Sequence, residues 1–180
     1  MRQTRSMILA ALFAALTAVG TWIRIPTPVS SFTMQVFVTA MAGVLLGGKW
    51  GAVSQAAYIL LGLAGLPVFT SGGGIGALCQ PTGGFLLAMP PMAWVIGRMV
   101  EKRGASFCSV CLACAVGLAV LYAVGLSYMH LILTVYLQQN WTVLQTVVSG
   151  MVVFLPWDAV KMVLTGMLCT RIYPAIHKIL

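Results

Sequence analysis

Six apolar runs, separated by short breaks rich in proline, glycine or charge, account for most of this sequence. They cover residues 7–23, 33–47, 51–64, 81–100, 106–131 and 143–173. A helix needs about 20 apolar residues to cross the roughly 30 Å hydrocarbon core of a bilayer. We therefore predict an all-α integral membrane protein whose six transmembrane helices form a single domain over residues 1–180.

The second and third runs are too short for ordinary spans. Each would extend about 22 Å as a helix at 1.5 Å per residue, and glycines at 47, 48 and 51 place a hinge between them. Short spans beside a glycine-rich segment are typical of a binding cavity at that side of the membrane. In the fourth run, the consecutive prolines 90 and 91 predict a kink or a break.

The composition places this protein in a membrane. Hydrophobic residues make up 61% of the chain and charged residues only 7%, whereas soluble domains carry about 25% charged residues. The net charge of +8 would suggest a nucleic-acid partner in a soluble protein. Here the basic residues lie at the ends of apolar runs, so we predict that they set the topology and that no nucleic acid is bound.

The basic residues also predict the orientation in the cell membrane. With cytoplasmic N- and C-termini, eight of the ten basic residues fall on the cytoplasmic side: Arg2, Arg5, Lys49, Arg98, Lys102, Arg103, Arg171 and Lys178. Arg24 is then outside and Lys161 lies within a span. The positive-inside rule favours this orientation. It directs the loops around Pro26 and Gln138, and the glycine-rich stretch between helices 3 and 4, to the outside.

That stretch, residues 62–84, holds eight of the chain's 19 glycines. Glycine lets the backbone adopt positive φ and approach a ligand closely. Irregular backbone persists at membrane depth only when it is buried in protein or lines a cavity. We interpret the stretch as a folded outward loop with accessible N–H groups; the alternative is a flexible connector.

Asp158 is the one acidic residue inside an apolar run, and Lys161 follows three residues later on the same helical face. Each charge is costly in a bilayer, so we expect both to face the bundle interior and to pair. A purely structural ion pair is the alternative. An acid and a base three residues apart also suggest acid–base catalysis, but no nucleophile or metal set accompanies them.

Other candidate chemistry is weak. Cys108, Cys111 and Cys114 have the spacing of an iron–sulfur ligand run, but it is also a helical spacing within an apolar span. His130 and His177 are isolated, so we predict no metal site and no cofactor. The complete nucleotide-binding P-loop pattern does not occur, so we expect no ATP hydrolysis by this chain.

Several segments together resemble the BioY family. They are residues 28–35 (PVSSFTMQ), 43–47 (GVLLG), 62–69 (GLAGLPVF), 72–74 (GGG), 81–85 (PTGGF) and 154–161 (FLPWDAVK). This family comprises biotin-specific substrate-binding (S) components of energy-coupling factor (ECF) transporters. The similarity covers nearly the whole chain, with Val153 and Gln80 standing where the family often has proline and glycine.

The resemblance implies six helices and an outward-facing biotin site closed by the first and third loops. It also implies partners: a transmembrane coupling protein and two ABC-type ATPases that supply energy. In the first helix, Ala10 and Ala14 form a small-residue face, which suits close helix approach and looks like the family's docking surface. Packing of this face within its own bundle is the alternative.

On this basis we expect no enzyme, but a membrane subunit that captures biotin from outside and delivers it inward with its partners. Asp158 is expected to accept ureido N–H groups, and glycine-loop amides and the helix start to meet a polar end of the ligand. The expected binding residues are Asp158, Lys161, Phe69, Gly73, Gly74, Gln80, Thr82, Gly83, Gly84 and Phe85. The alternatives are another small vitamin-like ligand, or a membrane-embedded enzyme using Asp158 and Lys161.

Overall fold

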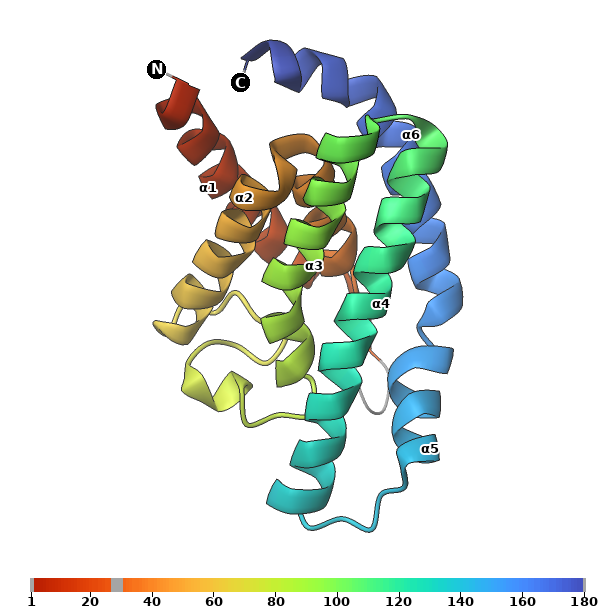
Figure 1. The fold of residues 1–180 in the computed structure, drawn as a ribbon. Coiled ribbons are helices and arrows are strands. Elements are labelled where there is room, and N and C mark those ends of the chain that lie inside the picture. The colour runs from red at the N-terminus through yellow and green to blue at the C-terminus, as the bar shows by residue number, and fades with distance from the viewer. Residues whose placement is uncertain (1, 27–30, 180) are drawn as a thin grey trace.

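A computed structural model describes residues 2–26 and 31–179 as a helical bundle with one short β-ribbon (Figure 1). Residues 27–30, in the predicted first outside loop, lie outside the described residues. The main elements are α1 (Arg2–Trp22), β1 (Arg24–Pro26), β2 (Ser31–Thr33), α2 (Gln35–Leu63), α3 (Gly83–Arg103), α4 (Phe107–Leu131), α5 (Val143–Val147) and α6 (Leu155–Ile179). The two strands pair antiparallel.

Helix α2 reverses direction near its middle. Gly47 has φ 79° and ψ 176°, a non-helical conformation that separates two helical halves. A side chain at Gly51 would meet the backbone of Gly43, so the halves fold back against each other. Glu101 of α3 accepts a hydrogen bond of 2.8 Å from the Gly48 N–H and ties the turn to the bundle. The glycine hinge between two short segments is thus confirmed.

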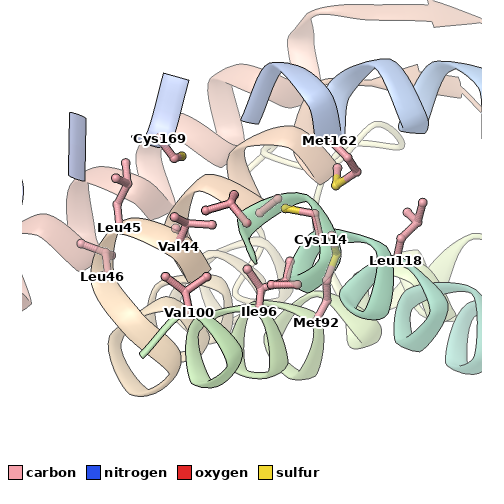
Figure 2. Packing of buried hydrophobic residues seen from close by; sticks show 14 of the residues in the cluster. Val44, Leu45, Leu46, Met92, Ile96, Val100, Cys114, Leu118, Met162 and Cys169 are labelled. Carbon is pink, nitrogen blue, oxygen red and sulfur yellow. The ribbon is translucent and has the colours of Figure 1, made fainter. Parts of the chain in front are cut away.

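The core lies between α2, α3, α4 and α6. Figure 2 shows buried side chains of these helices meeting: Val44, Leu45, Leu46, Met92, Ile96, Val100, Cys114, Leu118, Met162 and Cys169. Large apolar side chains also cover the outer faces, for example Leu60, Val135 and Val160. Among the described residues, five helical segments are long and apolar enough to cross a bilayer. An apolar outer surface around a packed interior suits a protein embedded in lipid.

The last apolar run does not form a single long helix. Helix α5 continues into the π-helical turn η3 (Val148–Val152), and a short turn then precedes α6. Pro156 lies in the first turn of α6, where its missing N–H needs no helical partner. By contrast, α3 continues through Pro90 and Pro91, so no break occurs there.

The beginning of α1 and the end of α6 lie at the same end of the bundle (Figure 1). The connection between α2 and α3, residues 64–82, lies towards the opposite end together with the β-ribbon and the loop before α5. We call residues 64–82 the glycine loop. It includes the 3₁₀ turn η1 (Ile75–Ala77) and contributes residues to the candidate site.

Candidate functional site

A partly open cavity lies among β2, the start of α2, the glycine loop, α3, α4, η3 and α6. Its lining is mixed in character. The residues are Thr33, Gln35, Val36, Thr70, Ser71, Ala77, Thr82, Phe85, Leu86, Met89, Leu121, Tyr122, Met129, Gly150, Phe154, Asp158 and Lys161. Small-molecule sites combine a largely apolar wall with a few polar groups in this way.

The charged part of the cavity is a buried trio. Lys161 donates to Asp158 Oδ1 at 2.9 Å, and the Tyr122 hydroxyl donates to Asp158 Oδ2 at 2.7 Å. Asp158 is only 3% exposed and Lys161 8%. Both carboxylate oxygens are therefore held from within the chain, and each retains acceptor capacity. The ammonium group of Lys161 likewise has further N–H donors besides the one that Asp158 takes.

Local helix geometry explains the pairing of Asp158 with Lys161, and tertiary packing adds Tyr122 to them. Asp158 and Lys161 are three residues apart in α6, which places both on one helical face. Tyr122 comes from α4, 36 residues away. The ring of Phe85 in α3 packs edge-on against Tyr122, with ring centres 6.4 Å apart. Three helices thus position one polar group against an aromatic wall.

Hydroxyl groups gather at the part of the cavity formed by the loops. Thr70 and Ser71 of the glycine loop, Thr82 before α3 and Thr33 of β2 all line it. Arg24 of β1 donates a hydrogen bond of 2.6 Å to the carbonyl oxygen of Thr70. This bond joins the β-ribbon to the glycine loop, so two loops that are distant in sequence enclose one side of the cavity.

Four of the predicted binding residues line the cavity: Asp158, Lys161, Thr82 and Phe85. The pairing of Asp158 with Lys161 is confirmed. Thr82 occupies the N-cap position of α3, but its side chain makes no capping hydrogen bond.

The other predicted binding residues lie around the cavity rather than in its lining. Phe69 is buried against Tyr58, with ring centres 5.5 Å apart. Gly73 packs on the backbone of residues 65 and 66, and the Gly74 N–H donates to the Gly62 carbonyl at 2.8 Å. These residues shape the glycine loop itself, so their role as ligand contacts stays a prediction.

The same holds where the glycine loop joins α3. Gly83 packs against the backbone of Leu78, and Gly84 lies against the Tyr128 side chain of α4. Gln80 is exposed. The two glycines permit close packing, and a ligand contact by any of the three stays a prediction.

Sequence reasoning missed five polar residues of the cavity lining: Thr33, Gln35, Thr70, Ser71 and Tyr122. Two of them, Tyr122 and Gln35, belong to long helices. Both carried a signal, because a tyrosine or glutamine within an apolar span needs a hydrogen-bond partner when buried. The pattern did not show what those partners would be. Gln35 belongs to the first turn of α2, and the predicted run began only two residues before it.

The docking prediction for Ala10 and Ala14 needs correction. Both residues are only 4% exposed, and each packs within a buried cluster of this chain. Ala11 and Ala15, on the adjacent face of α1, are exposed. The face of Ala10 and Ala14 therefore packs inside the bundle, because its small side chains let α1 approach its neighbours closely.

Within residues 2–26 and 31–179, no group of three histidine, cysteine or acidic side chains is placed to hold a metal ion. The arrangement offers instead a buried ion pair, a phenolic hydroxyl and an aromatic wall. Such a site can recognise a small molecule that combines an apolar ring with hydrogen-bonding groups.

Comparisons with known proteins agree on one family. The sequence profile of the BioY family matches residues 1–178. The probable biotin transporter BioY of Lysinibacillus sphaericus is 39% identical over 173 residues, covering 96% of this chain and 88% of that protein. The biotin transporter BioY of Thermotoga maritima is 36% identical over 169 residues, covering 93% and 95% respectively.

A solved structure supports the same assignment. The crystal structure of the S-component for biotin from an ECF-type ABC transporter superposes with a TM-score of 0.82 at 27% sequence identity, covering 94% of this chain and 91% of that one. Profile, relatives and fold thus concur over nearly the full length, and this chain belongs to the BioY family.

Proposed function

We propose that this chain binds biotin from outside the cell and is the substrate-binding S component of an ECF transporter. The observation that carries the proposal is the buried Tyr122–Asp158–Lys161 trio beside an aromatic wall in a loop-covered cavity. Membership of the BioY family supports the choice of ligand. The chain is a transport protein and not an enzyme, so biotin leaves it chemically unchanged.

The ring system of biotin suits the inner part of the cavity. Its cyclic urea has two N–H donors and one carbonyl acceptor. The Asp158 carboxylate offers acceptors for the N–H groups, and the Lys161 ammonium offers a donor for the carbonyl. Phe85, Met89 and Phe154 provide apolar surface for the fused sulfur-containing ring. Each polar atom of the ring then has a partner, as burial requires.

The carboxylate tail is proposed to point towards the loops. A ligand carboxylate beside Asp158 would be repelled by the like charge. At the loop side, the hydroxyls of Thr70, Ser71 and Thr82 supply donors, and Arg24 supplies positive charge nearby through its bond to Thr70. This orientation leaves the charged end of the ligand nearest to the entrance and the ring deepest.

In the membrane, we propose six crossings, with the two halves of α2 counted separately. The turn at Gly47 and the packing of Gly51 on Gly43 support this count. The N- and C-termini are cytoplasmic in this arrangement, because most of the basic residues then lie inside. The glycine loop consequently faces outward in the cell membrane, where it meets biotin.

Transport also needs an energy source. We propose that a transmembrane coupling protein and two ABC-type ATPases provide it, which agrees with the description of the solved relative as part of an ECF-type ABC transporter. The chain contributes recognition and the membrane-embedded cavity, and ATP hydrolysis belongs to the partners.

Thermal unfolding of the purified chain in detergent tests the proposal. A ligand that binds only the folded state stabilises it by about 2.7 kcal/mol at 100 times its dissociation constant, so saturating biotin should raise the melting temperature clearly. Recovered ligand should be unaltered biotin by mass spectrometry. Biotin amidated at its tail tests the orientation, because it should bind more weakly while keeping the ring contacts. Stabilisation by a different vitamin, with none by biotin, would refute the choice of ligand.

A further inference from the structure

Three buried side chains form a directed series of hydrogen bonds between the cavity and the glycine loop. The Thr33 hydroxyl donates to Gln35 Oε1 at 2.9 Å, Gln35 Nε2 donates to the Tyr58 hydroxyl at 2.6 Å, and that hydroxyl donates to the Val68 carbonyl oxygen at 2.9 Å. We call this series the Tyr58 relay. It joins β2, both halves of α2 and the loop.

One end of the relay lies in the cavity lining, and the other end lies next to it in the chain. Thr33 and Gln35 belong to the cavity lining, as do Thr70 and Ser71 just after Val68. Tyr58 itself does not line the cavity and is only 1% exposed. A change at Tyr58 can therefore affect a ligand only through the residues that Tyr58 contacts.

The loop segment held by Tyr58 behaves as a small folded unit. Phe69 and Gly72 exchange two backbone hydrogen bonds, of 2.8 and 3.0 Å. The Phe69 ring packs edge-on against the Tyr58 ring. Holding the Val68 carbonyl therefore also fixes the backbone that carries Thr70 and Ser71 over the cavity.

The direction of the relay depends on the single proton of the Tyr58 hydroxyl. Gln35 Nε2 donates to the phenolic oxygen, so that proton is available to the Val68 carbonyl oxygen at 2.9 Å, which is nearer than the Thr21 hydroxyl oxygen at 3.1 Å. If the Gln35 amide were turned over, its oxygen would compete for the same proton and the bond to the loop would be lost. Thr33 opposes this turn by donating to the amide oxygen.

We propose that the Tyr58 relay holds the glycine loop closed over the cavity and couples loop closure to occupancy through Gln35. The coupling part rests on the proposed binding of biotin. A ligand that contacts the Gln35 amide stabilises the amide orientation in which the Tyr58 hydroxyl donates to the Val68 carbonyl oxygen. Tyr58 and Thr33 are positioning residues in this scheme, since they act on the site through Gln35 and the loop.

Tyr58→Phe tests the relay because it removes the hydroxyl and alters no residue of the cavity lining. The hydroxyl contacts Thr21, Gln35 and Val68, and of these bonds only the one to Val68 holds the loop. One hydrogen bond contributes about 0.5–1.5 kcal/mol, or roughly three- to tenfold in an equilibrium. We expect biotin to leave the variant about three- to tenfold faster, with little change in its association rate. Amide hydrogen exchange in residues 66–74 should rise by a similar factor in the ligand-free protein.

Thr21→Val is the matched control. The Thr21 hydroxyl lies 3.1 Å from the Tyr58 hydroxyl and is also buried, but it belongs to α1 and lies outside the relay. Its removal should leave loop exchange and biotin release within twofold of the wild type. Thr33→Val gives a second test at the far end of the relay and should accelerate loop exchange in the same direction as Tyr58→Phe.

The outcomes separate the two proposals. If the wild type fails to bind biotin, the proposed function fails, while loop exchange in the ligand-free variants still tests the relay. If Tyr58→Phe folds but leaves loop exchange and biotin release unchanged, the relay is refuted. An equal effect of Thr21→Val would also refute it, by showing that any lost buried bond to this hydroxyl loosens the bundle. Should Tyr58→Phe not fold, unchanged loop exchange in Thr33→Val would refute the relay instead.

Discussion

Removing the cation from the buried ion pair tests the chemistry of the cavity most directly. In Lys161→Met, the Asp158 carboxylate stays buried and keeps its hydrogen bond from Tyr122 but loses its charge partner. Breaking a buried pair by removing one partner costs about 3–5 kcal/mol. We expect a melting temperature lower by on the order of 10 °C, together with loss of biotin binding.

The double variant, Asp158→Asn with Lys161→Met, separates stability from recognition. It carries no buried charge at these positions, and the new amide oxygen can still accept a hydrogen bond from the Tyr122 hydroxyl. Stability should return to within about 1 kcal/mol of the wild type. Biotin binding should remain about ten- to hundredfold weaker, because a ureido N–H and the ureido carbonyl lose charged partners worth roughly 1.5–3 kcal/mol.

Melting in detergent and equilibrium binding of radiolabelled biotin would be measured on each variant. Arg98→Met is the control, because it removes the exposed ion pair between Arg98 and Glu101, whose side chains are 57% and 40% exposed. Such a pair contributes about 0–1 kcal/mol, so this variant should bind biotin normally. Near-normal affinity in a folded double variant would refute the proposed ligand contact and leave Asp158 and Lys161 as a structural pair.

Two further predictions concern packing and use the same melting assay. Gly84→Ala should lower the free energy of unfolding by about 1–3 kcal/mol through overpacking, because the new methyl group would overlap the Tyr128 side chain. The control is Gly76→Ala, whose methyl group would have no atom within 4 Å and should be near neutral. Equal stability of the two variants would contradict this packing. Ala14→Leu should destabilise by a similar amount, because Ala14 is buried, while Ala11→Leu should change little on the exposed side of α1. Greater destabilisation by Ala11→Leu would show that α1 is rotated relative to this structure.

The helical framework was accessible from the sequence because its signals are local. Long apolar runs predict membrane helices regardless of their neighbours. The glycine hinge near Gly47 could be placed because its conformation depends on the residue itself, and a φ of 79° strongly favours glycine. The spacing of Asp158 and Lys161 put them on one helical face, and the cost of lone charges in a bilayer predicted their pairing.

Partners that are distant in sequence depended on the tertiary structure. The hydrogen bond from Tyr122 to Asp158 joins residues 36 positions apart, and the bond from Gln35 to Tyr58 joins residues 23 apart. Periodicity predicts which residues share a face of one helix, but the helix that this face meets is chosen by packing across the whole bundle. For the same reason, the sequence could not decide whether the face of Ala14 docks a partner or packs internally. Only the assembled bundle buries that face, because small side chains suit either contact equally well.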